Sequence, residues 1–155
     1  MVNDGIKVRG DLNIVLRGAD GEIKDERLLT NLVVTDGLNL ICSRLKDATA
    51  NVPSHMAIGT GTTAAAAGDS ALGTEASGGS YARQSVGTPT LNTTNKSIQF
   101  QSTFGAGVGT GAITESGIFN ASTSGDMLAR VVFSAVNKGA SDSLQITHTI
   151  TLSAS

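Results

Sequence analysis

The strongest constraint on the fold is an alternation of apolar and polar side chains near the end of the chain. Between Leu144 and Leu152, every second residue is apolar or is His148, and Gln or Thr occupies the positions between them. Residues 98–104 and 127–133 show the same period of two. Because successive side chains of a strand point to opposite faces of a sheet, this pattern predicts strands with one buried and one exposed face.

The small residues of the chain support the same fold class. Gly, Ala, Ser and Thr make up 71 of the 155 residues, and only five residues are aromatic. Thr-rich strands with glycine in the turns are typical of β proteins whose backbones pack closely. We therefore predict a single, mainly β domain over residues 1–155, an antiparallel β-sandwich or small barrel of about seven to nine strands.

The N-terminal segment is predicted to form a β-hairpin over residues 5–29. Its turn is at Asp20 and Gly21, because Asp-Gly readily adopts positive φ, and its first strand has a break in register around Gly10. Ten charged residues lie in this segment. The hairpin, taken as residues 1–29, is either a docking part attached to a β-rich body over 30–155, or two further strands of the same sandwich.

One short helix is predicted over residues 36–47, with Thr35 or Asp36 as its N-cap. The spacing of its apolar residues places four side chains on one helical face, which we expect to be buried. These are Leu38, Ile41, Cys42 and Leu45.

Composition and charge argue against several classes of protein. The net charge is −2 without a basic block, so the electrostatic basis for binding nucleic acid is missing. No apolar run approaches the roughly 20 residues of a membrane helix. The polar start of the sequence does not predict a secretory signal, and the lone Cys42 excludes an internal disulfide framework. We therefore expect neither nucleic acid nor a membrane among the partners.

Two glycine-rich segments, 59–64 and 107–112, match the GxGxxA spacing of dinucleotide-binding loops. That fingerprint needs a helix that opens within a βαβ unit, which the pattern does not predict, so we interpret both segments as turns. The histidines, His55 and His148, have no predicted partners for a metal or a catalytic triad. We expect His148 to fill a polar gap in the core or an inter-subunit contact. We predict no enzyme activity and no catalytic, cofactor-binding or metal-binding residues.

Glu115 and Arg130 lie in neighbouring predicted strands. The simplest interpretation is a cross-strand salt bridge. A contact with the capsid lattice or with a neighbouring subunit is the alternative.

Several segments occur in an order that resembles a known group of proteins. They are residues 31–37, 56–63, 68–73, 109–111, 113–120 and 127–130. Together they resemble a widespread group of structural proteins of tailed bacteriophages, which includes capsid decoration (cement) proteins and related tail and fibre proteins. The resemblance spans roughly residues 30–152. It implies a virion protein, assembled in the host bacterial cytoplasm, whose family has no catalytic residues.

Within that group, we expect a capsid decoration protein that binds the major capsid protein on the outer surface of the head and stabilises the shell. A tail, collar or fibre-base protein is the alternative in the same class, and a host-surface binding module is an alternative in another class. The hairpin 1–29 would dock on the particle, with the loop 105–111 as the next candidate.

We also expect a homo-oligomer, with a trimer favoured. Charges are sparse after Glu75, and edge strands without charges to protect them need a partner.

Overall fold

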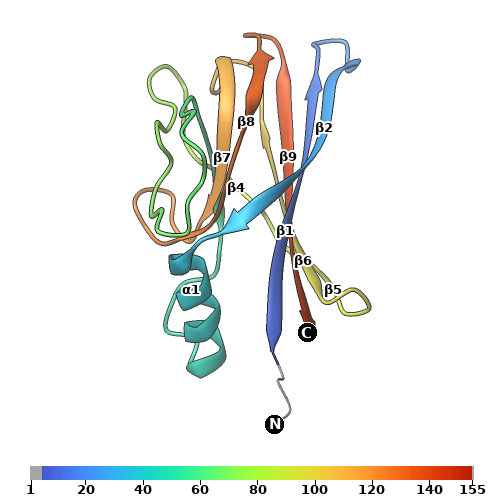
Figure 1. Ribbon diagram of the computed structural model, residues 1–155. Helices are drawn as coiled ribbons and strands as arrows, with labels where there is room; N and C mark the ends of the chain where they lie inside the picture. Colours follow the sequence, from blue (N-terminus) through green and yellow to red (C-terminus); the bar gives the residue numbers. More distant parts are fainter. Residues whose placement is uncertain (1–4, 155) are drawn as a thin grey trace.

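The computed structural model describes residues 5–154, and within them the chain forms one helix and nine strands (Figure 1). In chain order these are β1 (Ile6–Arg17), β2 (Ile23–Val33), α1 (Thr35–Lys46), β3 (His55–Gly59), β4 (Gln84–Ser85), β5 (Thr90–Asn92), β6 (Ser97–Phe104), β7 (Gly111–Phe119), β8 (Met127–Lys138) and β9 (Ser143–Ala154). Paired strands are antiparallel throughout. The predicted fold class, mainly β and antiparallel with one short helix, is confirmed.

The strands form a single curled sheet in the order β4-β3-β7-β8-β2-β1-β9-β6-β5. Strand β2 is the bend of this sheet, because it pairs with β1 over most of its length and with β8 only through Leu32 and Val33. Strands β7 and β8 therefore face β1, β9 and β6 across the interior (Figure 1). At the opposite side of the curl, the Ser102 hydroxyl of β6 donates to the carbonyl of Ser85 in β4 at 3.0 Å. The result is a half-barrel with a sandwich-like core.

Aliphatic side chains from both layers fill this core. The predicted alternation holds in β9, where Leu144, Ile146 and Ile150 are buried together with His148. They pack in one cluster with residues of β1, β3, β6, β7 and β8. Burial of these alternating faces is the main driving force for the fold, because each fully buried aliphatic side chain contributes about 1.5–3 kcal/mol.

The N-terminal hairpin supplies part of this core. Strand β1 lies between β2 and β9, and its residues Leu12, Ile14 and Leu16 are buried. The hairpin forms two strands of the same sheet, as the second interpretation expects, and its docking role stays a prediction. The break in register lies between Leu16 and Arg17 and not around Gly10, where it was predicted.

Gly10 is instead paired regularly on both sides, with Asn31 in β2 and Ile150 in β9. A Cβ atom at Gly10 would lie 1.3 Å from Oδ1 of Asn31, so the glycine makes room for the Asn31 side chain. A glycine inside a strand can mark close packing as well as a bulge, which is why the prediction at this position was wrong.

The predicted buried face of α1 is wrong for three of its four residues. Leu38, Cys42 and Leu45 are exposed, and only Ile41 packs, half-buried, against the core. The fully buried residues of the helix are Gly37 and Leu40. The helix begins after Val34 without a side-chain cap, so the predicted N-cap, Thr35 or Asp36, is wrong.

The reason for this orientation is the close contact of α1 with β8. A Cβ atom at Gly37 would lie 2.1 Å from the backbone oxygen of Leu128, so the helix rests on the sheet at its glycine. With the helix in this position, Leu38, Cys42 and Leu45 point away from the core.

Candidate functional site

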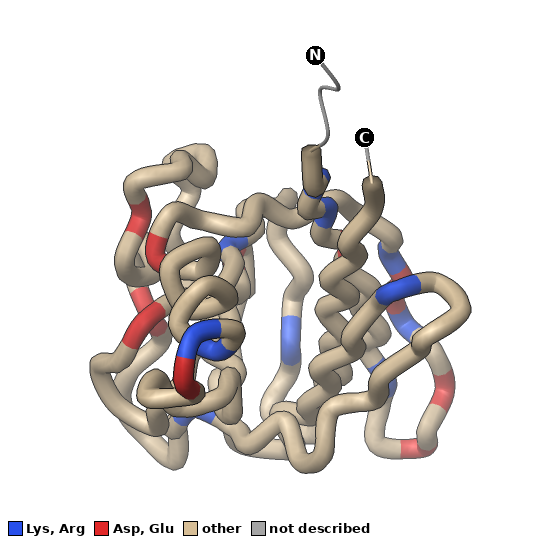
Figure 2. Tube along the Cα trace, turned by 90° about the horizontal axis from the view of Figure 1, so that it is seen from below, with Lys and Arg blue, Asp and Glu red and all other residues tan. Residues whose placement is uncertain are grey.

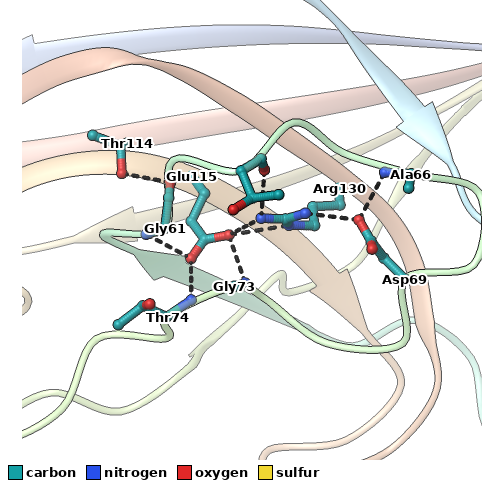
Figure 3. A network of polar contacts seen from close by, with 9 residues as sticks. Gly61, Ala66, Asp69, Gly73, Thr74, Thr114, Glu115 and Arg130 are labelled. Atoms are coloured by element: carbon teal, nitrogen blue, oxygen red, sulfur yellow. Dashed lines mark hydrogen bonds and ion pairs between the residues drawn. The ribbon is translucent and has the colours of Figure 1, made fainter.

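The long loop between β3 and β4 is fastened to the sheet by a buried cluster of charges (Figure 3). Arg130 of β8 is the centre of this cluster, and its side chain is only 2% exposed. Its Nη2 lies 2.8 Å from Oε2 of Glu115 on β7, and its Nη1 lies 2.7 Å from Oδ2 of Asp69 in the loop. The cross-strand salt bridge between Glu115 and Arg130 is confirmed, and Asp69 extends it to the loop.

Glu115 also binds the backbone of this loop. Its carboxylate is buried and accepts hydrogen bonds from the N–H groups of Gly61 at 2.9 Å, Thr74 at 2.7 Å and Gly73 at 2.9 Å. A Cβ atom at Gly61 would lie 2.4 Å from Glu115 Oε1, so only glycine permits this approach. The motif at 59–64 therefore gives one N–H group, from Gly61, to a carboxylate of the same chain.

The protonation of the cluster follows from these contacts. Burial alone would raise the pKa of Glu115, but hydrogen bonds from Thr74 and Arg130 outweigh burial and hold this pKa below its usual range. The N–H of Ala66 and the Arg130 guanidinium lower the pKa of Asp69. Both carboxylates stay ionised at neutral pH with their hydrogen bonds directed into the fold, which is typical of a structural anchor rather than of a general acid or base.

A second arginine fastens the end of the same loop. Arg83 donates to both carboxylate oxygens of Glu75, at 2.9 and 2.8 Å. Its Nη1 donates to the carbonyls of Ala121 and Ser124 in the loop between β7 and β8. The guanidinium carbon also lies 3.6 Å from the centroid of the Phe119 ring, a cation–π contact. Side-chain contacts thus hold a loop that has little regular secondary structure.

A line of polar side chains crosses the hydrophobic core. The Nε2 atom of His148 lies 3.1 Å from the hydroxyl of Ser116 on β7, and its Nδ1 lies 2.7 Å from Nδ2 of Asn31 on β2. His148 is completely buried, which confirms the prediction of a polar residue in the core. Burial lowers its pKa to about 3, so the imidazole is neutral at physiological pH.

Ser116, His148 and Asn31 contact one another in the order of the nucleophile, the base and the orienting residue of a hydrolase triad. Their place in the molecule differs from that of a triad. A nucleophilic serine must reach the substrate, and here the Ser116 and His148 side chains are inside the core. The line therefore acts as a polar tie between the two layers.

His55, at the start of β3, contacts the hydroxyl of Ser54. Within residues 5–154, no three His, Cys, Asp or Glu side chains are grouped to hold a metal ion.

The end of the molecule that carries α1 contains an apolar cleft of about 660 Å³. Helix α1 forms one wall, and β5 and β6 form the other; Figure 2 looks at this end from below. Its floor consists of Leu40, Phe100, Leu128 and Ile150, which are buried. Its rim consists of Leu45, Val52 and Leu91, which are exposed.

A second hollow, which we call the terminal groove, lies beside the start of α1 and measures about 480 Å³. It forms where β2 leaves β1 to join β8, and exposed Ile6, Leu32 and Leu38 line it. Among the described residues, eight large apolar side chains are exposed, and six of them line the cleft or the terminal groove. Apolar surface concentrated in this way marks an interaction surface.

Sequence reasoning missed this surface. Its residues come from segments as distant as Ile6 and Leu152, and only the fold brings them together. The sequence did contain one signal of this surface, the apolar helical stripe with Leu38 and Leu45. Its helical spacing alone predicts a face buried in the core.

The two docking candidates from the sequence lie in other places. The tip of the β1–β2 hairpin is at the end opposite to α1 (Figure 1). Residues 105–111 form the expected turn between β6 and β7, with positive φ at Gly107 and Gly109. Docking through either segment stays a prediction.

These features define a structural protein, with a β-rich body, polar groups engaged inside the fold and an apolar end. The family model described as podophage GP4 fiber I protein gp80 matches residues 34–153. Because this match covers most of the chain, the chain belongs to that family of bacteriophage fibre proteins and is a structural protein of the virion. No curated protein matches the chain significantly. Among residues 5–154, no helix has both the length and the apolar character needed to cross a membrane.

Proposed function

We propose that this chain is a structural subunit of a tail-associated fibre, attached to a neighbouring virion protein through the terminal groove. The family match supports the fibre role. The observation that carries the attachment is the concentration of exposed apolar side chains at the α1 end, where β1 begins and β9 ends.

Covering the terminal groove removes apolar surface from water. Ile6 is 77% exposed, and burying one such side chain contributes about 1.5–3 kcal/mol. Leu32 and Leu38 add to this contact. A structural subunit needs many such small contributions from repeated copies and no chemical step.

Capsid decoration, the function expected from the sequence, is the second candidate. The strands contain at most 12 residues, so the body is short and suits broad contacts on a shell as well as a place within a fibre. In that case the partner is the major capsid protein.

The location of the chain on the virion distinguishes the two candidates. We expect electron microscopy of virions that carry a tagged chain to show label confined to the tail, with few copies per particle. Label spread over the whole head, with copies that scale with the capsid lattice, would reject the fibre role in favour of decoration. Label on neither would reject both.

A matched pair of substitutions tests the attachment surface. Ile6→Asp places a charge in the terminal groove, whereas Leu28→Asp places one on β2, at a side chain that is 80% exposed and lines neither hollow. We expect quantitative mass spectrometry of purified virions to find Ile6→Asp strongly depleted and Leu28→Asp at the wild-type level. Equal incorporation of both variants would contradict attachment through the groove.

A further inference from the structure

The cleft between α1 and the β5–β6 hairpin is deep. Its floor residues Leu40, Phe100, Leu128 and Ile150 are each at most 5% exposed, whereas Leu45 at its rim is 81% exposed. A flat protein interface lacks such a difference in exposed fraction between its central and its peripheral side chains. The cleft volume of about 660 Å³ lies within the range of small-molecule sites, roughly 300–1,000 Å³.

The lining of the cleft is aliphatic. Leucine, isoleucine, valine and proline side chains dominate it, and Phe100 is the one aromatic residue among the described lining residues. A sugar or a nucleobase binds by stacking on aromatic faces, which this lining does not offer. An unbranched hydrocarbon chain needs only apolar walls, and it gains about four-fold in affinity for each methylene group that it buries.

The charged side chains that line the cleft have one sign. Arg44 on α1 and Lys96 before β6 line the cleft, and no described lining residue carries a carboxylate. Within residues 5–154, neither cation forms an ion pair. Arg44 Nη1 donates to the carbonyls of Ala48 and Ala50, which holds the guanidinium in place and leaves its other N–H groups available. The mouth is therefore complementary to an anion.

We propose that this cleft binds an anionic amphiphile through one straight hydrocarbon chain. Its straight aliphatic chain lies on the floor above Leu128 and Ile150, and its carboxylate or phosphate head lies at the mouth near Arg44 and Lys96. A free fatty acid and one acyl chain of an anionic phospholipid share this chemistry. The proposal goes beyond the structural role in the virion and does not depend on it.

The first test is a titration of the ¹⁵N-labelled full chain, followed by NMR. The probes are octanoate, decanoate and dodecanoate below their critical micelle concentrations, and dodecyltrimethylammonium as a chain of equal length with the opposite charge. We expect saturable binding at one site, shifts centred on the cleft, and tighter binding with each added methylene. The ammonium probe should bind at least several-fold more weakly than dodecanoate.

Substitutions at the mouth separate this site from general adsorption. Lys96→Glu and Arg44→Gln should each weaken dodecanoate binding about three-fold, the size typical of an exposed charge pair. Lys7→Glu is the matched control, because Lys7 is exposed, forms no ion pair within the described chain and lines neither hollow. It should leave the affinity unchanged.

Co-sedimentation with phosphatidylglycerol vesicles then identifies the source of the ligand. Binding to vesicles that Lys96→Glu weakens would assign the site to lipid, whereas binding of dodecanoate alone would assign it to free fatty acids. Equal affinity for the ammonium probe, an equal effect of Lys7→Glu, or no shifts in the cleft would overturn the proposal. A stable dimer that Leu45→Asp dissociates would also overturn it, because the cleft would then be covered by a second copy. None of these measurements involves the virion, so their failure is distinct from a failure of the fibre role.

Discussion

Among single residues, Glu115 and Arg130 show how a chain with few charges uses them inside the fold. A buried ion is tolerated only when its charge and its hydrogen bonds are satisfied. Glu115 receives three backbone N–H groups and one guanidinium, and Arg130 also reaches Asp69. The pair therefore fixes the position of a loop that the hydrophobic core alone would leave undefined.

Replacing Glu115 tests this role. Glu115→Gln keeps the shape of the side chain but leaves Arg130 without its buried anion, so we expect the free energy of unfolding to fall by about 3–5 kcal/mol. Urea denaturation at pH 7.5 measures the change. Glu26→Gln, at an exposed carboxylate without an ion pair in the described chain, should change stability by less than about 0.5 kcal/mol. Equal effects of the two substitutions would contradict the anchor.

His148 makes stability depend on pH. The unfolded imidazole takes up a proton below about pH 6.5, but the buried imidazole does not until about pH 3, so acid favours the unfolded chain between these values. We expect the free energy of unfolding to fall by about 1.4 kcal/mol per pH unit below pH 6. Because the pKa values of Glu115 and Asp69 are lowered, their protonation reduces the free energy of unfolding only at more acidic pH.

Urea denaturation between pH 5 and 7.5 isolates this histidine. His148→Gln should be less stable at neutral pH but should show a flatter dependence on pH. His55→Gln is the matched control, and it should keep the slope of the unchanged chain. A slope that persists in His148→Gln would assign the pH dependence to other groups.

Among the elements, α1 is oriented by one glycine. Gly→Ala inside an exposed helix gains about 1 kcal/mol from helix propensity. At Gly37 the new Cβ would press on the backbone oxygen of Leu128, so we expect Gly37→Ala to lower the free energy of unfolding by about 1–3 kcal/mol. Asn39→Ala, at an exposed site of the same helix, should be neutral or slightly stabilising. Stabilisation by Gly37→Ala in thermal denaturation would show that α1 does not rest on β8 at this residue.

The N-terminal hairpin is an integral element rather than an appendage. Deleting residues 1–29 removes β1 from the middle of the sheet and exposes the edge of β9 and the core residues beneath it. We expect the truncated chain to be insoluble or unfolded by circular dichroism. A soluble, folded truncated chain that no longer joins virions would instead make the hairpin a separable docking part.

For the whole molecule, oligomeric state is the main prediction that the structure leaves to experiment. The sheet ends in the short strands β4 and β5, and after Glu75 the sequence offers few charges to protect such edges. We expect sedimentation equilibrium at micromolar concentration to show a homo-oligomer, with a trimer favoured. A stable monomer over this range would contradict self-assembly in solution.

The sequence by itself determined the N-terminal hairpin, the alternating strands β6, β8 and β9, and the place of His148 on the apolar face of β9. These follow from short-range rules, because side-chain period and turn chemistry act over a few residues. The salt bridge between Glu115 and Arg130 was also accessible, since it joins two strands connected by one turn.

Only the tertiary structure decided the buried face of α1, the partners of the Glu115 carboxylate and the two apolar hollows. Gly37 meets Leu128, and Gly61 meets Glu115, across long stretches of chain. Such contacts depend on where β2 bends the sheet, and no local pattern encodes that bend. The exposed stripe through Leu38 and Leu45 has the same helical period as a buried one, so its exposure followed from the packing of α1 on β8 alone.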